Sequence, residues 1–462
     1  MDGLECKEVC KSELERTLRI DSEFYSKNYV EIYNMLSSLA HKPLTAYVDV
    51  SDGNHMGISE QFSDEGIPYY RGQDAGAFFI ENSNPICIDE ITFNRPVMKR
   101  SHLTKGDVLL SIVGTIGALS LVYSNKKATC SCKLAILRPK KNGIEAVIAT
   151  FLKGKYGQAQ IKRYTRGAVQ KGLILEDMDQ LLIPEFSDDF TKSIHESVQY
   201  SHTLQERAIA EYESAEHILR SKVDVGVVVQ TSISQKALSA SFGSTGRLDA
   251  EYYQEKYQIY ESAVRSSVHG YTCVRNAFLP VKEKCLRDLP FYHYVEIGDV
   301  NVETGIATFN VIDTEQLPDN AKIMTQKGDL LVSTVRPNRG AVAILESDDL
   351  LVSGAFTVLR EAGDYPKEVL QVLLRTSMYR DWLLRFNVGT SYPVIKDEDV
   401  LNMPIPLLED NVKQDVVNKV NESASLRRQS KQLLEYAKQA VEMAIEQGED
   451  AALVWLKERS GE

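Results

Sequence analysis

Two long stretches of the chain carry apolar residues at steps of four and three, the spacing that places them on one face of an α-helix. The first stretch covers residues 188–223 and the second covers 410–445. The two seams are formed by Ile194, Val198, Ser201, Gln205, Ala208, Tyr212, Ala215 and Leu219, and by Val416, Val420, Ser423, Leu434, Ala437 and Val441. Helices with such stripes bury them, and each stretch is the obvious partner of the other. We therefore expect two paired helices, each roughly 50 Å long at about 1.5 Å per residue.

Outside these stretches the pattern changes to short apolar runs bounded by turn residues, which predicts strands. The first set comprises strands at 67–74, 107–113, 118–123 and 134–137, a turn at 114–117 and a helix at 144–156. The second set comprises strands at 292–300, 330–335, 341–345 and 356–359 and a helix at 366–375. Each set predicts a module of mixed α+β structure.

The two sets are copies of each other, because GDVLLSIV (106–113) recurs as GDLLVSTV (328–335) and LLIP (181–184) recurs as MPIP (403–406). The offset is 222 at both ends, and no gap is needed between them. A second repeat lies upstream, where RIDSEFY (19–25) recurs as RLDAEYY (247–253) at an offset of 228. Both upstream copies are predicted to start an amphipathic helix, with acidic residues in the first turn. The chain is thus a duplication.

The expected fold class is therefore α+β, with two tandem modules separated by two long helices. The predicted segments are a first module with its N-terminal helix (1–187), a central helix (188–230), a Ser-, Gly- and Ala-rich linker (231–246), a second module (247–406) and a distal helix (407–462). A chain of 462 residues is long enough for two or three domains.

Composition places the chain among ordinary globular proteins, with 43% hydrophobic and 26% charged residues. No apolar run approaches the roughly 18 residues of a membrane span, and the N-terminus lacks the basic and apolar regions of a signal peptide. We therefore expect a cytoplasmic protein without a membrane partner. The seven cysteines are scattered and lack zinc-ligand spacing, which favours reduced thiols.

Charge is unevenly distributed along the chain, although the net value is −12. Residues 95–175 contain 16 Lys or Arg but only two acidic residues, which gives this segment a charge of +14. Such a segment in an acidic protein indicates a localised anionic partner, and the alternative is a solvated basic face. The matching residues 317–397 contain ten basic and ten acidic residues, so the two copies share a scaffold but not a surface.

Motifs of nucleic-acid enzymes are absent from the sequence. It has no Gly-x4-Gly-Lys-Ser/Thr loop, no Gly-x-Gly-x-x-Gly, no Asn/Asp-Pro-Pro-Tyr/Phe and no His-Glu-x-x-His, and the one Pro-Asp lacks the acid-x-Lys of a restriction nuclease. Gly114 and Gly117 could cradle a phosphate, but their spacing favours a hairpin turn. We expect no catalytic residue, no metal ligand and no cofactor bound by this chain.

Residues suited to reading DNA do occur at corresponding places in both copies. Base edges are read by Arg, Gln and Asn, while Lys and Arg hold phosphates. The candidates in the first copy are Arg71, Gln73, Arg95, Lys99, Arg100, Lys162, Arg163, Arg166, Gln170 and Lys171. Those in the second copy are Arg336, Asn338, Arg339, Ser391, Tyr392 and Lys396. Different chemistry at corresponding places predicts two modules that bind double-stranded DNA and read different sequences.

The GDVLLSxVGTIG run, the RLDAEYY motif and the long helix after each module together resemble the specificity subunit of type I restriction-modification systems. The resemblance implies two target-recognition domains held apart by an antiparallel coiled coil, each domain reading one half of a split DNA site. It further implies a subunit without a catalytic centre that docks two adenine methyltransferase subunits on its helices. S-adenosylmethionine is then expected on those subunits, and nuclease/translocase subunits complete an enzyme of phage defence. The helix residues that the resemblance connects with partner assembly are Ile194, Val198, Tyr212, Leu219, Val416, Val420, Leu434 and Val441.

One part of the motif differs between the copies, because Gly114-Thr115-Ile116-Gly117 is replaced by Arg336-Pro337-Asn338-Arg339. This turn must differ in shape, which favours an asymmetric target. The resemblance does not separate systems with distinct methyltransferase and nuclease subunits from systems that fuse them. A rival interpretation is a duplicated protein-interaction scaffold whose basic face lacks DNA sequence specificity, and a third is an enzyme that acts alone.

Overall fold

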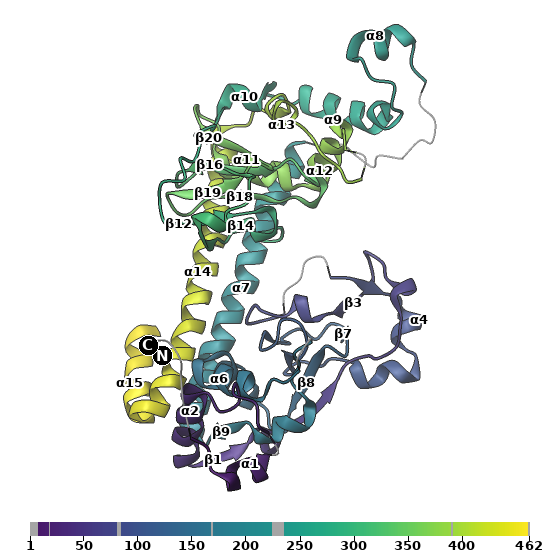
Figure 1. Ribbon diagram of the computed structural model, residues 1–462. Helices are drawn as coiled ribbons and strands as arrows, with labels where there is room; N and C mark the ends of the chain where they lie inside the picture. Colours follow the sequence, from purple (N-terminus) through teal and green to yellow (C-terminus); the bar gives the residue numbers. More distant parts are fainter. Residues whose placement is uncertain are drawn as a thin grey trace. The chain divides into compact units, whose positions relative to one another are not determined.

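The computed structural model describes residues 8–17, 19–80, 85–167, 170–223, 235–389 and 391–460. By contacts between residues, the chain forms two compact units (Figure 1). Unit 1 contains Met1–Glu206 and Leu426–Glu462, and unit 2 contains Arg207–Ser425. Each unit therefore combines one of the predicted modules with half of each long helix.

The main sheet of each unit has four antiparallel strands in the same order. In unit 1 the order is β2-β8-β5-β6, formed by Val48–Asp52, Leu134–Pro139, Val108–Ser111 and Leu119–Leu121. In unit 2 it is β11-β20-β17-β18, formed by Phe278–Pro280, Phe356–Glu361, Leu330–Ser333 and Val342–Ile344. The strands predicted in both modules are confirmed. Sequence patterning did not reveal the edge strands β2 and β11.

Strand β5 is buried on both faces, which explains its unbroken apolar sequence. Val108 and Leu110 lie in the core that includes α5 (Ile144–Lys153), whereas Leu109 faces a separate core with Ile136. Strand β17 repeats this division, since Leu330 belongs to one core and Leu331 to another. A strand covered on both sides shows a continuous apolar run instead of alternation.

A second sheet lies beside the main sheet in each unit. In unit 1 it is β4-β3-β7, formed by Cys87–Ile88, Ile67–Tyr70 and Thr129–Cys130, with β3 parallel to β7. In unit 2 it is β15-β12-β19-β16, formed by Asn310–Asp313, Phe291–Val295, Leu350–Ser353 and Ala321–Thr325, with β12 parallel to β19. The strands predicted at 67–74 and 292–300 are therefore confirmed, and the second sheet has four strands in unit 2 but three in unit 1.

The helix predicted at 366–375 is confirmed, whereas the helix predicted at 144–156 ends at Lys153, and in each unit a second helix that was not predicted follows. In unit 1, α5 is followed by α6 (Lys155–Tyr164), and Gly154 between them has an extended backbone. In unit 2, α11 (Lys367–Arg375) is followed by α12 (Ser377–Leu383), because the Thr376 side chain accepts a hydrogen bond from the Tyr379 N–H and starts a new helix. Apolar periodicity continues through each break, so it could not reveal this cap.

The turn between the second and third strands of the main sheet is one residue longer in unit 2. Ser111 N donates to Ala118 O, whereas its copy Ser333 N donates to Ala341 O. The residue numbers of β18 therefore exceed those of its copy β6 by 223. Between β18 and β20 the connection is one residue shorter than between β6 and β8, so the difference returns to 222 at β20. The prediction that no gap separates the copies is wrong at this turn, because equal insertions and deletions cancel between the ends of the repeat.

The upstream motif precedes a helix and does not start it. Helix α2 begins at Lys27 and ends at Ser38, and α9 spans Glu255–Arg265. The carboxylate of Asp21 accepts hydrogen bonds from the Phe24 N–H at 3.1 Å and from the Arg19 guanidinium at 2.8 Å. These bonds hold residues 19–25 in a turn, so the prediction of a helix start at the motif is wrong.

The two long helices, α7 (Asp188–Lys222) and α14 (Asp410–Gln447), pair in antiparallel orientation (Figure 1). In unit 1 the Ser201 hydroxyl donates to the Ser430 carbonyl at 3.1 Å, and in unit 2 the Ser423 hydroxyl donates to the Ala208 carbonyl at 2.6 Å. Ser423 is the copy of Ser201 in the repeat, so one contact is made twice. The predicted helix pair is confirmed.

A last helix, α15 (Glu449–Ser460), packs on unit 1 through Ala452 and Leu456. The Glu449 carboxylate accepts hydrogen bonds from the backbone N–H and the hydroxyl of Ser187, which joins this helix to the start of α7. None of the helices in the described parts of the chain has both the length and the apolar character needed to cross a membrane.

Candidate nucleic-acid interface

Three segments of unit 1 meet at the end of strand β5 and form what we call turn cluster 1: residues 71–74, 112–118 and the described residues of 166–172. Val113 pairs with Gly172, and the Leu173 N–H donates to the Ile112 carbonyl at 3.0 Å. The Thr115 hydroxyl donates to the Gly72 carbonyl at 2.9 Å, which ties residues 71–74 to the turn. This cluster brings together the predicted residues Arg71, Gln73, Arg166, Gln170 and Lys171.

The corresponding place in unit 2, turn cluster 2, contains residues 334–341 and the described residues of 388–395. Val335 pairs with Val394, the copy of the pairing in unit 1, and the Ile395 N–H donates to the Thr334 carbonyl at 2.9 Å. The Arg336 N–H donates to the Pro393 carbonyl at 2.7 Å. The predicted residues at this cluster are Arg336, Asn338, Arg339, Ser391 and Tyr392, and all five are exposed.

Two carboxylate–arginine pairs fix the strand that leads into each cluster. Asp107 is fully buried and accepts bonds from Arg138 Nε at 2.8 Å and Nη2 at 2.7 Å. Its copy Asp329 accepts from Arg360 at 2.7 and 2.8 Å. The hydrogen bonds that Arg138 and Arg360 donate to these carboxylates raise the pKa of both arginines. The strand positions are thereby set by the same contact in both units.

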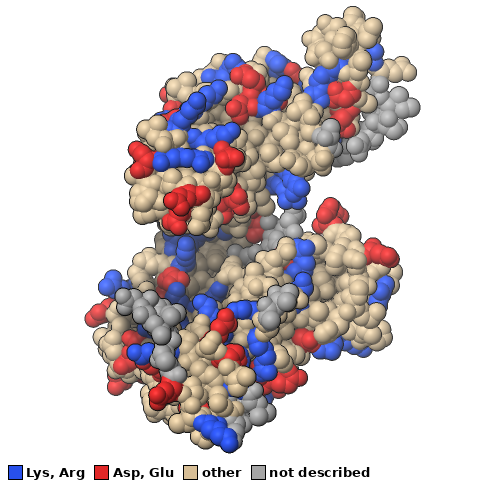
Figure 2. Space-filling model, in the orientation of Figure 1, with Lys and Arg blue, Asp and Glu red and all other residues tan. Residues whose placement is uncertain are grey.

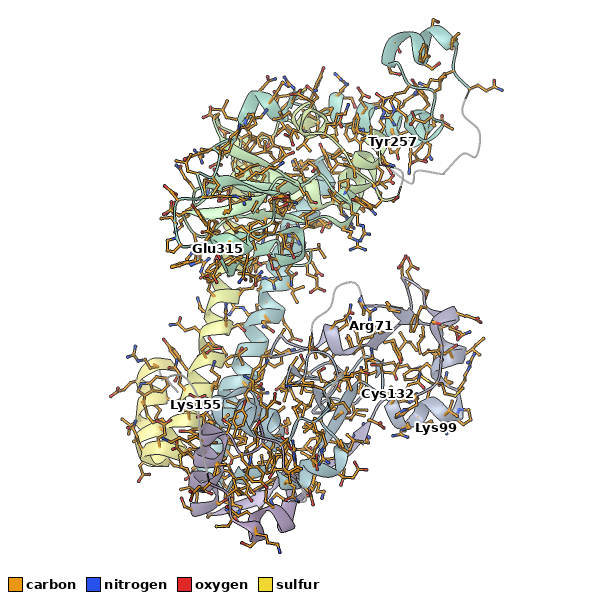
Figure 3. All side chains as sticks on the ribbon, viewed as in Figure 1. Arg71, Lys99, Cys132, Lys155, Tyr257 and Glu315 are labelled. Carbon is orange, nitrogen blue, oxygen red and sulfur yellow. The ribbon has the colours of Figure 1, made fainter. Side chains whose placement is uncertain are left out.

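Three other candidates, Arg95, Lys99 and Arg100, lie apart from turn cluster 1. They belong to or precede the short 3-10 helix Pro96–Ser101, which packs beside β7 and α4 (Glu90–Phe93). Arg100 forms an ion pair with Asp52. Figure 3 shows Arg71 and Lys99 on different parts of the module, with Cys132 between them. These three residues therefore form a second basic group.

Arg163 is only 5% exposed, so the prediction that it faces DNA is wrong. Its guanidinium stacks on the rings of Phe24 and Tyr33, each at 4.3 Å, and Nε donates to the Phe24 carbonyl at 3.2 Å. Lys162, its neighbour in α6, is exposed. Burial explains the difference, since the helix turns Arg163 toward the module core and Lys162 toward solvent.

A contact that the sequence did not assign to the site holds the base of each cluster. Arg19 stacks on Phe24 at 4.4 Å and donates to the Thr165 carbonyl at 3.3 Å, directly before Arg166. In unit 2, Arg247 stacks on Tyr252 at 4.6 Å and donates to the Asn387 carbonyl at 2.8 Å. We call these contacts the arginine clasps. The repeated Arg-x-Asp motif was the signal for them.

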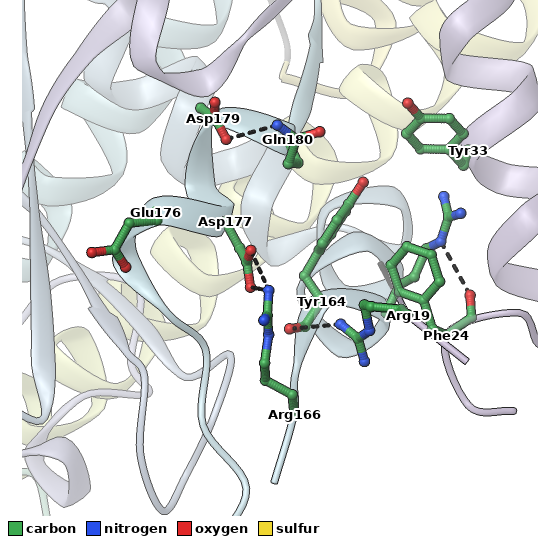
Figure 4. A pocket seen from close by; sticks show the side chains of 10 residues that line it. Arg19, Phe24, Tyr33, Tyr164, Arg166, Glu176, Asp177, Asp179 and Gln180 are labelled. Atoms are coloured by element: carbon green, nitrogen blue, oxygen red, sulfur yellow. Dashed lines mark hydrogen bonds and ion pairs between the residues drawn. The ribbon is translucent and has the colours of Figure 1, made fainter. Parts of the chain in front are cut away.

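The clasp of unit 1 lines a cavity of about 430 Å³ (Figure 4). Its walls include Arg19, Phe24, Arg166 and Asp177, and Figure 4 shows Arg166 beside the Asp177 carboxylate. The hydrogen bond from Arg19 lowers the pKa of Asp21, as the bond from Arg247 lowers that of Asp249. Both clasps thus stay ion-paired at neutral pH.

The charge excess of residues 95–175 is partly balanced in space by acids from elsewhere in unit 1. At least eight of the sixteen basic residues form ion pairs, among them Arg100 with Asp52, Arg166 with Asp177 and Lys171 with Glu23. On the face drawn in Figure 2, Lys and Arg atoms are interspersed with Asp and Glu atoms. Exposed pairs contribute only about 0–1 kcal/mol each, so a phosphate can replace the carboxylate.

Five other candidates form no ion pair of this kind within the described chain. In the described chain, Lys99, Lys162, Arg336, Arg339 and Lys396 are exposed and lie outside ion-pair distance of any described carboxylate. Turn cluster 1 therefore presents cations that are partly neutralised by carboxylates of the same unit. Turn cluster 2 presents guanidinium groups that form no ion pair within the described chain.

The helix residues connected with partner assembly point into the cores. Ile194, Val198, Leu434 and Val441 are buried in unit 1, and Leu219, Val416 and Val420 are buried in unit 2. Tyr212 is partly buried against the unit 2 core, with the Arg375 guanidinium 4.5 Å from its ring centre. These side chains hold the helices together, so a partner would contact other positions on the same helices.

The chemistry available at the clusters is hydrogen bonding and charge, supplied by guanidinium, amide, hydroxyl and ammonium groups. Within the described ranges, no three His, Cys, Asp or Glu side chains are grouped so that they could hold a metal ion. Burial raises the pKa of the Cys130 thiol, which keeps it protonated and unreactive.

These features define a duplicated α+β protein with one turn cluster in each unit and paired long helices. The sequence matches no protein-family model, and no curated protein matches it. Among solved structures, the chain is similar to the S subunit of a type I restriction-modification system from M. genitalium, with 14% identity, coverage of 90% of this chain and 95% of that one, and a TM-score of 0.35.

Two further solved structures are similar to this chain. The HsdS subunit from Thermoanaerobacter tengcongensis shares 12% identity, with coverage of 90% and 96% and a TM-score of 0.26. A chain from a study of complex assembly and conformational transition of the type I restriction-modification system shares 13% identity, with coverage of 87% and 98% and a TM-score of 0.27.

Proposed function

We propose that this chain is the non-catalytic DNA-recognition subunit of a type I restriction-modification complex, in which each unit reads one half of a split, asymmetric site. The observation that carries the proposal is the pair of turn clusters. Each cluster lies at the corresponding place on the main sheet of its own unit and is held by corresponding backbone pairings. The two clusters present different side chains. Duplicated supports with different exposed donors suit two different base sequences.

The partners that we propose are two adenine methyltransferase subunits, bound along the exposed faces of α7 and α14, with nuclease/translocase subunits in the full complex. S-adenosylmethionine would bind to the methyltransferase subunits. The similar proteins described above are subunits or complexes of such systems, which supports the choice of partner class. The chain's own contribution would be to position the DNA.

The test is protection of DNA by the full chain together with a methyltransferase subunit of the same system. We expect protection of two short half-sites separated by unprotected base pairs. Replacing Lys162, Arg166 and Lys171 together by Ala should weaken protection of one half-site, because these residues lie in or beside turn cluster 1. Replacing Arg339 and Lys396 by Ala should weaken the other half-site.

Arg163 is left out of this test, because its replacement would disturb the fold. Equal weakening of both half-sites by either set would contradict the assignment of one unit to each half. Binding that depends on salt but not on sequence would contradict the function itself and favour the interaction scaffold, since phosphate contacts carry no sequence information.

A further inference from the structure

One position in the turn that follows β5 in unit 1 and β17 in unit 2 has a left-handed backbone in both units. Gly114 has φ +84° in unit 1, and its copy Arg336 has φ +51° in unit 2. Glycine adopts this conformation without steric cost, whereas a residue with a Cβ is disfavoured there. The turn therefore favours glycine at this position, and unit 2 nevertheless has an arginine.

Two other non-glycine residues in the described chain have positive φ, and in both the conformation has a local explanation. Arg287 (φ +54°) donates from its side chain to the Pro318 carbonyl at 2.8 Å, so its guanidinium supports the local fold. Asp349 (φ +56°) belongs to a residue type that tolerates this region. Arg336 differs, because no hydrogen bond or ion pair joins its guanidinium to another described residue.

The backbone of the turn is held without the Arg336 side chain. The Arg336 N–H donates to the Pro393 carbonyl at 2.7 Å, and its carbonyl accepts from the Arg339 N–H at 3.0 Å. In the shorter turn of unit 1 a Cβ at Gly114 would meet no atom within 4 Å, and in unit 2 Arg336 itself is exposed, so neither turn encloses a side chain at this position. The arginine is thus dispensable for the fold and free to meet a ligand.

A single contact orients the guanidinium, which lies 5.5 Å from the ring centre of Tyr392. Tyr392 is itself 47% exposed and belongs to a loop that is closed by the Asn387 side chain, which accepts hydrogen bonds from the Gly389 N–H at 2.8 Å and the Val394 N–H at 3.0 Å. Stacking on a fixed ring restricts the guanidinium before any ligand binds, which lowers the entropy lost on binding.

We propose that Arg336, held on Tyr392, reads a guanine in the major groove of the half-site bound by unit 2. This inference rests on the proposed function and names the base that this position recognises. A planar fork of donors matches the O6 and N7 acceptors of guanine, and arginine to guanine is the commonest specific contact in protein–DNA complexes. Unit 1 has no side chain at the same position, so its half-site is read from other residues.

The test uses the full chain with its methyltransferase partner and a duplex that contains the protected site. Arg336→Gly places the residue that the turn favours, so the melting temperature should stay the same or rise. Affinity for the site should fall about tenfold to a hundredfold, the loss expected for one bidentate base contact. Arg336→Lys keeps the charge but not the fork, and we expect a similar loss.

The matched control is Arg339→Ala, which removes the same charge from the same turn. We expect it to weaken protection of the half-site of unit 2 by the same factor whichever guanine of that half-site is altered, because a phosphate contact carries no sequence information. Each guanine of that half-site is then replaced in turn by 7-deazaguanine, which lacks the N7 acceptor. One such replacement should weaken binding of the wild-type chain and leave binding of Arg336→Gly unchanged.

The outcomes separate the two claims. If the wild-type chain distinguishes the site from other DNA and Arg336→Gly binds it equally well, or loses only what Arg339→Ala loses, the inference is overturned while the proposed function stands. If the wild-type chain does not distinguish the site at all, the proposed function fails and the inference fails with it.

Discussion

The two units share the buried residues that support their turns and differ in the turns themselves. The buried pair Asp107–Arg138 recurs as Asp329–Arg360, with donor–acceptor distances between 2.7 and 2.8 Å in both. A few residues beyond each pair, the turn carries Gly114 in one unit and Arg336 in the other. Residues that support the turns repeat, and residues that the turns expose do not. That division separates the side chains that maintain the fold from those available for specificity.

The prediction with the largest expected effect tests whether the seam between the two long helices contributes equally to the stability of both units. Leu434 is 9% exposed in the unit 1 core, and its copy in the repeat is Tyr212, which is only partly buried. Leu434→Asp should lower the free energy of unfolding by about 4 kcal/mol or more, because it removes core contacts and buries a carboxylate. Urea unfolding measures the loss.

Two variants complete the seam experiment. Tyr212→Asp should cost less than Leu434→Asp, since its side chain reaches solvent. Gln439→Asp adds the same charge to an exposed position of α14 and should change stability little. A cost for Leu434→Asp no greater than that of Gln439→Asp would contradict the packing of the two helices.

The second prediction tests the repeated ion pair. Asp107→Ala and Asp329→Ala should each lower the free energy of unfolding by about 3 kcal/mol, because each removes two bonds from an arginine and one from a backbone N–H. Asp313→Ala, at an exposed position, is the control and should have little effect. Urea unfolding that shows a large cost for one aspartate alone would break the equivalence of the units.

The third prediction concerns pH and the arginine clasps. The bonds from Arg19 and Arg247 lower the pKa values of Asp21 and Asp249 below their ordinary value of 3.8. A carboxyl group whose pKa is lowered by folding stabilises the protein above that ordinary value, and this stabilisation is lost as pH falls through the lowered pKa. Unfolding in urea between about pH 5 and pH 2 should show this loss.

Asparagine variants provide the comparison for the clasps. Asp21→Asn and Asp249→Asn should each make stability less dependent on pH in that range, and the double variant should show the sum of both changes because the sites are independent. An unchanged acid profile in both single variants would show that the clasps are not ion-paired in solution.

The smallest expected effect distinguishes Lys153 in unit 1 from its copy Arg375 in unit 2. Burial, with a further contribution from Lys438, lowers the pKa of Lys153 to about 8. The copy of Lys438 in the repeat is Glu216. Lys438→Glu should therefore raise the pKa of Lys153 toward its ordinary value of 10.5, because a like charge is replaced by an opposite one.

The shift can be followed by NMR titration of the lysine side chains. Since the unfolded chain binds the Lys153 proton more tightly than the folded one, stability should rise between about pH 8 and pH 10.5, and Lys438→Glu should reduce that rise. Lys431→Glu, at an exposed position one to two turns away on α14, is the control. A Lys153 pKa that stays the same in both variants would show that Lys438 exerts no influence.

Features that depend on local pattern could be predicted from the sequence. Repetition of GDVLLSIV as GDLLVSTV located β5 and β17, and the steps of three and four located α7 and α14. Arg166, Gln170 and Lys171 were candidates from residue type alone, and their place near the segment of Arg71 and Gln73, through the Val113–Gly172 pairing and the Thr115–Gly72 bond, was not predicted.

Features that depend on distant contacts could not be predicted. Burial of Arg163 results from the rings of Phe24 and Tyr33, which are more than a hundred residues away in the chain. Partial neutralisation of the basic segment likewise depends on Asp52, Glu23 and other remote acids. The clasp was visible as a repeated motif, but its turn conformation follows from bonds to the Asp21 carboxylate, which compete with helix formation.

The extra residue in the turn of unit 2 has a consequence for how such proteins diversify. The strands on both sides keep their pairing, since Leu330 pairs with Ile344 just as Val108 pairs with Leu121. Length can therefore change at this turn without moving the sheet that supports it. A lineage of these proteins can acquire new exposed surfaces by insertion and deletion as well as by substitution, while selection on the buried residues continues unaltered.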